Sequence, residues 1–261
     1  MKPILTIPFL GFKIARADAH EIVCNIVDHI NSRKFSGAAP IFLACLNPHS
    51  YVVSKSDDEF SKSLKSADWL ISDGVGISSA LRLCGNFFAA RVTGSDIYCN
   101  LLSDLNKLGV YKIFFLGSTS QSLEAIEKNF IADYPNLLIV GMVSPSFSHK
   151  IPEVENDEIL AKINSSGADI LWVGMTAPKQ EKWISGNLTR LNVGFIGAIG
   201  AVFDFYSGRI KRPPYIFRLI GLEWLLRLVG EPRRLWRRTF ISGPVFIFDA
   251  LKFILGFRVN R

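Results

Sequence analysis

Short apolar runs alternate with amphipathic segments along about the first 200 residues of the chain. The mostly apolar runs predict strands at Ile41–Leu46, Trp69–Ser72, Lys112–Leu116, Leu137–Val140, Ile170–Val173 and Val193–Ile196. Apolar residues at helical spacing predict helices between them, near Ala17–Ser32, Ser56–Ser66, Gly76–Leu83, Ser95–Leu108, Ser120–Tyr134, Val154–Asn164 and Pro178–Asn187. Apolar strands separated by helices predict a Rossmann-like α/β fold, whose mostly parallel sheet carries helices on both faces.

The pattern changes after Gly208. The segment Arg209–Pro214 is basic and rich in proline, which is typical of a hinge. Next comes Tyr215–Leu228, whose apolar positions surround most of a helix, and a second helix is expected to begin near Pro232. We therefore predict an α/β catalytic domain over residues 1–208 and a helical C-terminal appendage over residues 209–261.

The charge of the chain is concentrated in that appendage. The 261 residues have a net charge of +7, and the segment Arg209–Arg238, with nine bases and two acids, accounts for all of it. Arginines beside tryptophan and phenylalanine suit an anionic bilayer surface, nucleic acid phosphates or an oligomer interface. The residues that could contact a membrane or a diphosphate are Arg227, Arg233, Arg234, Arg237 and Arg238.

Two classes of segment are not expected. The start of the chain is too short and too broken by proline to be a signal peptide. The most apolar stretch, Phe240–Phe257, is interrupted by Gly243-Pro244, Asp249 and Lys252, so no membrane-spanning helix is expected. The four cysteines lack metal-ligand spacing, which favours reduced, buried thiols in a cytoplasmic protein.

Polar residues that directly follow predicted strands are the first candidates for a site, because ligands of open α/β sheets bind beyond the carboxyl ends of the strands. Asn47 follows the strand Ile41–Leu46 and could bind a sugar hydroxyl, or could only end the strand in a turn before Pro48. Asp73 follows the next strand on a glycine-rich turn, where a carboxylate could act as a general base or as an ordinary helix N-cap.

Two later junctions carry similar alternatives. Gly117 and Ser118 lie between a strand and a helix, where backbone amides suit a phosphate or a nucleotide base, although a plain turn has the same composition. Lys179 and Gln180 follow Pro178 in a first helical turn and could face the crevice or the solvent. The segment Arg91–Asp96 could present Arg91 to a pyrophosphate or could only cap the next helix.

Two other motifs are weak. The triplet Asp57–Glu59 resembles an acidic metal site, but together with Ser56 it fits a helix capping box better. The four histidines have no ligand spacing, so we expect neither a metal nor another cofactor. The turn after Asp73 is not a dinucleotide fingerprint, because Ser79 stands where the third glycine belongs.

Together these motifs resemble the WecG/TagA/CpsF glycosyltransferases, glycosyltransferase family 26, over about residues 5–240. The resemblance is carried by Asp73–Gly76, Arg91–Asp96, Val173-Gly174 with Pro178–Glu181, Gly200–Phe205 and Gly208–Arg212. It implies an enzyme that transfers a sugar, with inversion, from a UDP-sugar to a polyprenyl-diphosphate-linked saccharide at the cytoplasmic face of the inner membrane. The sugars that it suggests are N-acetylmannosamine, its uronic acid or glucose, and the products are bacterial surface polymers.

The resemblance also implies residue roles. Asp73 matches a proposed general base and Asn47 an active-site asparagine, while Gln180 and Arg91 match polar residues around the donor. Cys45 stands where the family often has threonine, which leaves the acceptor contacts open. The expected substrate-binding residues are Cys45, Arg91, Thr93, Gly117, Ser118, Gly174, Lys179, Asp204 and Arg212.

A lipid-linked acceptor favours a peripheral membrane protein over a nucleic acid binder, and a homo-oligomer is possible. The alternative functions are a nucleotide-binding module without catalysis and a Rossmann-type oxidoreductase. The incomplete glycine fingerprint disfavours the oxidoreductase.

Overall fold

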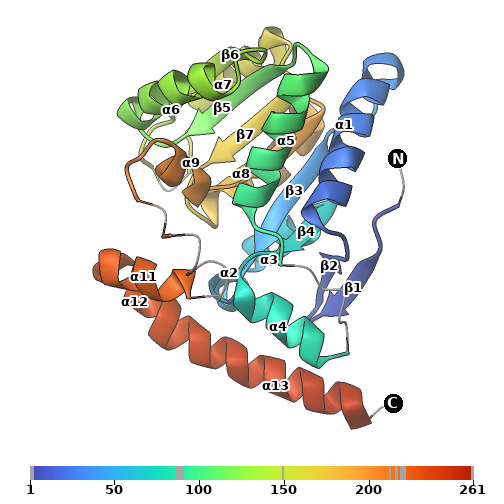
Figure 1. Ribbon diagram of the computed structural model, residues 1–261, viewed down its shortest axis with the longest axis vertical. Coiled ribbons are helices and arrows are strands. Elements are labelled where there is room, and N and C mark those ends of the chain that lie inside the picture. The colour runs from blue at the N-terminus through green and yellow to red at the C-terminus, as the bar shows by residue number, and fades with distance from the viewer. Residues whose placement is uncertain are drawn as a thin grey trace.

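A computed structural model describes residues 3–85, 91–148, 150–211, 213–214, 217 and 222–259. These residues form an eight-stranded sheet with the order β1-β2-β4-β3-β8-β7-β5-β6 (Figure 1). The strands are β1 (Thr6–Phe9), β2 (Phe12–Ala15), β3 (Ile41–Leu46), β4 (Trp69–Ser72), β5 (Lys112–Gly117), β6 (Leu138–Val143), β7 (Ile170–Gly174) and β8 (Phe195–Ala198). β1 and β2 pair antiparallel, and the other neighbours pair parallel.

Helices cover both faces of the sheet. One face packs against α3 (Asp58–Lys65), α4 (Val75–Leu83), α7 (Glu153–Ser166) and α8 (Lys179–Asn187). The other face packs against α1 (Ala19–Ser36), α5 (Gly94–Leu108), α6 (Ser120–Asp133) and α9 (Ala201–Tyr206). Within β3, Phe42 and Ala44 face the first set of helices, while Ile41 and Leu43 face the second. This alternation confirms the predicted doubly covered α/β fold.

Two parts of the N-terminal half were not predicted. The β1–β2 hairpin was missed because its strands have only four residues each and β1 contains Pro8, which an edge strand tolerates. The short helix α2 (Pro48–Ser54) follows β3 without a linker. It begins at Pro48, in the first turn of the helix. Backbone N–H groups have no partner within the helix there, so proline loses no hydrogen bond by lacking one.

The C-terminal region is helical, as predicted. It contains α11 (Glu223–Gly230), α12 (Pro232–Arg237), the π-helical turn η2 (Arg238–Ser242) and α13 (Gly243–Val259). Only the C-terminal half of the helix predicted at Tyr215–Leu228 falls in α11, and most of the remainder lies outside the described residues. The domain boundary at residue 208 stays a prediction.

Gly243-Pro244 does not interrupt the last helix. A helix runs from Pro232 to Gly256, and by length and composition alone these 25 residues are apolar enough to cross a membrane. The interruption expected at Gly243-Pro244 is therefore absent, whereas the expectation of no membrane-spanning helix stays a prediction. Pro244 cannot donate a hydrogen bond to the preceding turn, and the helix widens there into the π-helical turn that ends at Ser242.

α13 packs against the body of the protein, beside α2 and α4 (Figure 1). The ring of Phe246 lies 6.4 Å from the ring of Phe9 in the hairpin and 5.9 Å from that of Tyr51 in α2. The hydroxyl of Tyr51 donates a hydrogen bond of 2.9 Å to Asp249, which also pairs with Lys55 at 2.6 Å. The hairpin and α2, which the sequence did not predict, are thus among the elements that pack against α13.

The thiols are reduced, but only partly buried. Cys84 is buried, whereas Cys24 and Cys99 are exposed because they lie on the outer sides of α1 and α5. The prediction of four buried thiols was therefore wrong.

Candidate active site

The carboxyl ends of β4, β3, β8 and β7 lie next to one another in the sheet. The backbone N–H of Asp73, just after β4, donates a 2.8 Å hydrogen bond to the carbonyl of Leu46 at the end of β3. Asn47 follows β3, Gln180 lies in the first turn of α8 after β7, and Gly200 lies before α9 after β8. The sheet therefore brings the strand-end candidates from distant parts of the sequence to one edge.

Asp73 is half-buried and lies among arginines of the C-terminal region. Burial raises the pKa of its carboxyl group, and the nearby carboxylate of Glu223 adds to this. The positive charges of Arg238, Arg227 and Arg91 lower it, and Arg238 has the largest effect of the three. The balance leaves the pKa of Asp73 above that of an ordinary aspartate, which makes the carboxylate a better proton acceptor.

The three arginines have different environments. Arg91 donates a 3.0 Å hydrogen bond to Glu223 of α11, which ties the loop before α5 to the C-terminal region. The guanidinium of Arg227 lies 5.0 Å from the ring of Phe205, and its Nε is buried without a hydrogen-bond partner among the described residues. Arg238 is half-buried; burial and Arg227 lower its pKa, whereas Asp73 raises it.

Two predicted site residues also cap helices. The side chain of Asn47 accepts 3.0 Å hydrogen bonds from the N–H groups of His49 and Ser50 in α2. The hydroxyl of Thr93 accepts from the N–H of Asp96, whose carboxylate accepts from the N–H of Thr93 in turn, forming a capping box for α5. Asn47 thus ends β3 and also caps α2, a helix that the sequence did not predict, and its amide N–H groups have no hydrogen-bond partner among the described residues.

The glycines at the ends of β5 and β7 allow close packing. A Cβ on Gly117 would lie 2.5 Å from the carbonyl oxygen of Gly174, and a Cβ on Gly174 would lie 2.2 Å from the ring of Phe203. Ser118 donates its N–H to the carbonyl of Gly174 at 3.0 Å and adopts a left-handed conformation with φ of 59°. The contacts of these residues therefore join the ends of β5 and β7 to each other, and they join the end of β7 to α9.

Lys179 and Gln180 have different environments. The ammonium group of Lys179 donates to the carbonyls of Ser146 and Ser148 after β6, so it holds that loop. Gln180 is 5% exposed, and its side-chain oxygen accepts a 3.1 Å hydrogen bond from the N–H of Gly200. Of the two, Gln180 lies at the junction of β7 and β8.

Asp204 connects α9 to the C-terminal region. It pairs with Arg209, and one of its oxygens lies 3.7 Å from Arg234 of α12. Arg233 and Arg237 are exposed, and the guanidinium of Arg237 lies 5.5 Å from the ring of Trp236. Arg212 lies outside the described residues. Of the five predicted appendage arginines, Arg227 and Arg238 thus contribute most directly to the charge around Asp73.

Cys45 lies near Asp73 as well. A Cβ on Gly94 would be 3.3 Å from its sulfur, so the thiol packs against the start of α5. Burial raises the pKa of this thiol well above its ordinary value, and the charges of Asp73 and Glu181 raise it further. The thiol therefore stays neutral between two carboxyl groups.

The acidic triplet Asp57–Glu59 forms the start of α3 and has a structural role. Asp57 accepts a hydrogen bond from the N–H of Phe60 as the N-cap of α3, and it pairs with Lys182 at 2.8 Å. The triplet therefore caps a helix, but the N-cap is Asp57 and not Ser56, whose hydroxyl donates to the carbonyl of Val53, so the expected capping box is not formed. The described part of the chain contains no group of three or more histidine, cysteine, aspartate or glutamate residues that could hold a metal ion.

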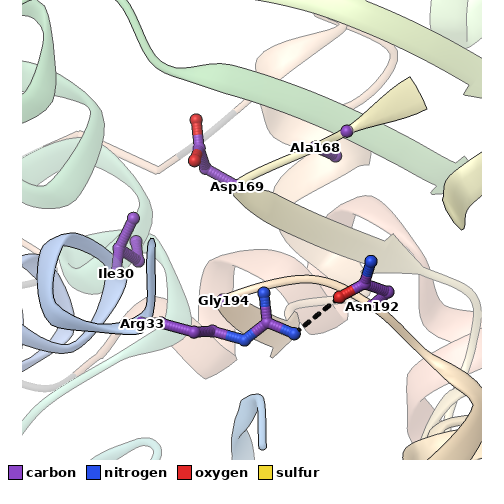
Figure 2. Close-up of a pocket in the computed structure, with 7 residues that line it drawn as sticks. Ile30, Arg33, Ala168, Asp169, Asn192 and Gly194 are labelled. Atoms are coloured by element: carbon purple, nitrogen blue, oxygen red, sulfur yellow. Dashed lines mark hydrogen bonds between the residues drawn. The ribbon is translucent and has the colours of Figure 1, made fainter. Parts of the chain in front are cut away.

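A hollow of about 140 Å³ lies at the opposite edge of the sheet (Figure 2). Its lining includes Asp169 before β7 and Gly194 before β8, and the guanidinium of Arg33 donates a 2.8 Å hydrogen bond to Asn192 beside it. These are the amino ends of the strands. Ligands of open parallel sheets bind at the carboxyl ends, so this hollow is not part of the candidate site.

Sequence reasoning missed two glutamates of this region. Glu223 is one of only two acids in the segment Arg209–Arg238, a signal that could have marked it as an arginine partner. Glu181 is buried in α8, and it precedes the buried Ile184 by three positions, so helical spacing already placed it on the inner face.

Comparisons with known proteins identify the family of the chain. The chain is 26% identical over 214 residues to an N-acetylglucosaminyldiphosphoundecaprenol N-acetyl-beta-D-mannosaminyltransferase of Staphylococcus aureus strain MW2, covering 81% of this chain and 80% of that protein. The protein of the same name from strain NCTC 8325 has the same identity and coverage. A family model matches residues 7–259, so the chain belongs to the WecG/TagA/CpsF glycosyltransferase family.

Proposed function

We propose that this glycosyltransferase moves a sugar, with inversion, from a UDP-sugar to a polyprenyl-diphosphate-linked saccharide in the synthesis of a bacterial surface or cell-wall polymer. N-acetylmannosamine is the preferred candidate because the relatives are named for its transfer, and its uronic acid and glucose are the others. The family membership disfavours a nucleotide-binding module without catalysis and an oxidoreductase.

The observation that carries this proposal is the position of Asp73. Its carboxyl group lies at a strand end with a raised pKa, in the field of Arg91, Arg227 and Arg238. An inverting transfer needs a base on the acceptor hydroxyl and positive charge near the departing diphosphate. In this proposal Asp73 is the base, the arginines stabilise the diphosphate, and Gln180 and Asn47 orient the sugars. The arginines provide charge without a metal, so we expect metal-independent transfer.

A donor screen tests the function. Purified protein is incubated with a short-chain polyprenyl-diphosphate saccharide and each UDP-sugar in turn, with and without a chelator, and released UDP is measured. We expect acceptor-dependent UDP release with UDP-N-acetylmannosamine that the chelator does not reduce. Release that does not depend on the acceptor, or no release with any donor, would contradict the proposal.

We also propose that the C-terminal helices rest on the cytoplasmic face of the inner membrane. Apolar residues are exposed along this region; we call them the apolar face, and they are Trp236, Phe240, Ile241, Val245, Ile247, Phe248, Leu251 and Leu255. Arg233, Arg237 and Lys252 are exposed beside it. Aromatic and aliphatic side chains next to basic ones suit the headgroup region of an anionic bilayer.

The packing of α13 supports a peripheral position rather than a span. Its inner face buries Phe246, Ala250 and Ile254 in the core, and Asp249 is paired with Lys55. A helix crossing the bilayer would lose these contacts and place Asp249 in the hydrocarbon, at a cost of about 2.5 kcal/mol or more.

The double substitution Phe248→Asp with Leu251→Asp tests the apolar face. Burying one such side chain is worth about 1.5–3 kcal/mol, so losing both should weaken binding at least about 100-fold. Co-sedimentation with vesicles containing anionic lipid measures this. Ile131→Asp, at an exposed apolar position on α6, is the matched control and should leave binding unchanged. Equal binding of the wild-type chain to neutral and anionic vesicles would contradict the proposed attraction between the basic residues and anionic lipid.

A further inference from the structure

The first turn of α8 holds a buried carboxyl group that the mechanism above does not use. Glu181 is 1% exposed, although glutamate is among the residues that are least often fully buried. Burying a carboxyl group costs free energy unless it is hydrogen-bonded. The hydrogen bonds around Glu181 therefore indicate its role.

Glu181 is the end of a short chain of hydrogen bonds. The backbone N–H of Gly200 donates to the side-chain oxygen of Gln180 at 3.1 Å, and the side-chain nitrogen of Gln180 donates to Oε1 of Glu181 at 2.9 Å. The two contacts allow only one orientation of the Gln180 amide, because a flipped amide would place a donor against the N–H of Gly200. Glu181 and Gly200 thus fix the amide between the ends of β7 and β8.

One N–H of the Gln180 amide is used by Glu181, and an amide nitrogen has two. The second N–H of this amide therefore points in a fixed direction and is not used in the hydrogen bond to Glu181. A Cβ on Gly200 would lie 3.2 Å from the Gln180 oxygen, so the backbone of that glycine packs closely against the amide. This arrangement preorganises Gln180 rather than leaving it to reorient when a ligand arrives.

The charge of Glu181 varies near neutral pH. Burial raises the pKa of its carboxyl group to about 7, against the opposing hydrogen bonds from Gln180 and from its own backbone N–H. The Cys45 thiol faces it from β3, and Asp73 acts on the same thiol. Oε2 is buried without a hydrogen-bond partner among the described residues, so a proton can bind there while Oε1 keeps its contact with Gln180.

We infer that Glu181 is a positioning residue for sugar transfer, which holds the Gln180 amide in its working orientation and holds it more strongly when ionised. The inference rests on the proposed function, since Gln180 is the group that would touch the sugar. Hydrogen bonds to an ionised acceptor are about twice as strong as neutral ones, so ionisation of Glu181 stiffens the contact without changing its geometry.

The test compares Glu181→Gln with Glu158→Gln, an exposed glutamate on α7. Glu181→Gln keeps the shape and an acceptor oxygen but cannot ionise. Losing a charged hydrogen bond should lower kcat about tenfold at pH 8, with KM for the donor changed less than about threefold. The wild-type rise in kcat through about pH 7 should disappear in this variant and persist in Glu158→Gln.

A second measurement does not depend on turnover. In nitrogen-15-labelled protein, the Gln180 side-chain amide resonances should shift with a midpoint near pH 7 in the wild type and in Glu158→Gln, and should not titrate in Glu181→Gln. Resonances that do not titrate in the wild type, or an unchanged kcat profile in Glu181→Gln, would overturn the inference. Absence of UDP release from the wild-type protein would instead reject the proposed function, while the resonances still test the contact between Glu181 and Gln180.

Discussion

Replacing Asp73 by asparagine should nearly abolish sugar transfer. The side chain keeps its size and its place after β4, but it can no longer accept a proton from the acceptor hydroxyl. General-base catalysis contributes about 10²–10⁴-fold, so UDP release should fall by that factor in the acceptor-dependent assay. UDP binding, measured by calorimetry, should remain.

Two controls show whether that loss of transfer comes from the missing carboxyl group or from a change in folding. The circular dichroism spectrum and the thermal unfolding of the Asp73→Asn variant should match those of the wild type, since the backbone bond from residue 73 to Leu46 does not involve the side chain. Asp68→Asn is not a suitable control, because Asp68 accepts a hydrogen bond from the N–H of Phe42. Asp28→Asn on the exposed side of α1 is suitable, because no hydrogen bond of that side chain is found among the described residues. Turnover retained by Asp73→Asn would reject Asp73 as the base.

Arg238→Met should cause the second-largest loss. Arg238 is the strongest positive influence on Asp73 among its neighbours, and in the proposed mechanism it stabilises charge on the departing diphosphate. Removing one preorganised charged donor costs about 10²–10³-fold in kcat. The matched control is Arg233→Met, an exposed arginine of α12, which should change kcat little and should affect vesicle binding instead.

The same substitution has a predicted effect on the pH profile. In the proposed mechanism transfer requires ionised Asp73, so kcat/KM should fall as the pH drops through the pKa of that carboxyl group. Arg238 lowers this pKa in the wild type. Without Arg238 the pKa rises, and the acid limb of the profile must move to higher pH. An acid limb that stays in place, or moves to lower pH, would contradict the electrostatic influence of Arg238 on Asp73.

The periodicity of the chain was enough to predict the parallel body of the fold. Strands such as Ile41–Leu46 and Trp69–Ser72 are apolar throughout because both faces of the sheet are covered, and their bounds agree with β3 and β4. Ligands bind beyond the carboxyl ends of parallel strands, and this rule predicted that Asn47, Asp73 and Gln180 lie near one edge of the sheet. These inferences succeeded because they depend on local sequence and on a general property of parallel sheets.

Elements that depend on distant partners were not predictable in this way. The hairpin strands have four residues each, and the break expected at Gly243-Pro244 is absorbed by a π-helical turn. α13 is positioned by rings such as Phe9 and Tyr51, which come from the first fifth of the sequence. No local pattern predicts which distant rings will meet, because their burial depends on the assembled shape.

By itself, the sequence determined the layered α/β body, the strand-end carboxylate and the local origin of the +7 charge. Only the tertiary structure decided how that charge is divided: Arg227 and Arg238 act on Asp73, Arg234 lies near Asp204, and Arg233 remains exposed. It also showed that Arg91 is held by Glu223 and that Gln180 is held by Glu181. Charge composition can be counted along a chain, but electrostatic energy depends on distance and burial, which folding alone sets.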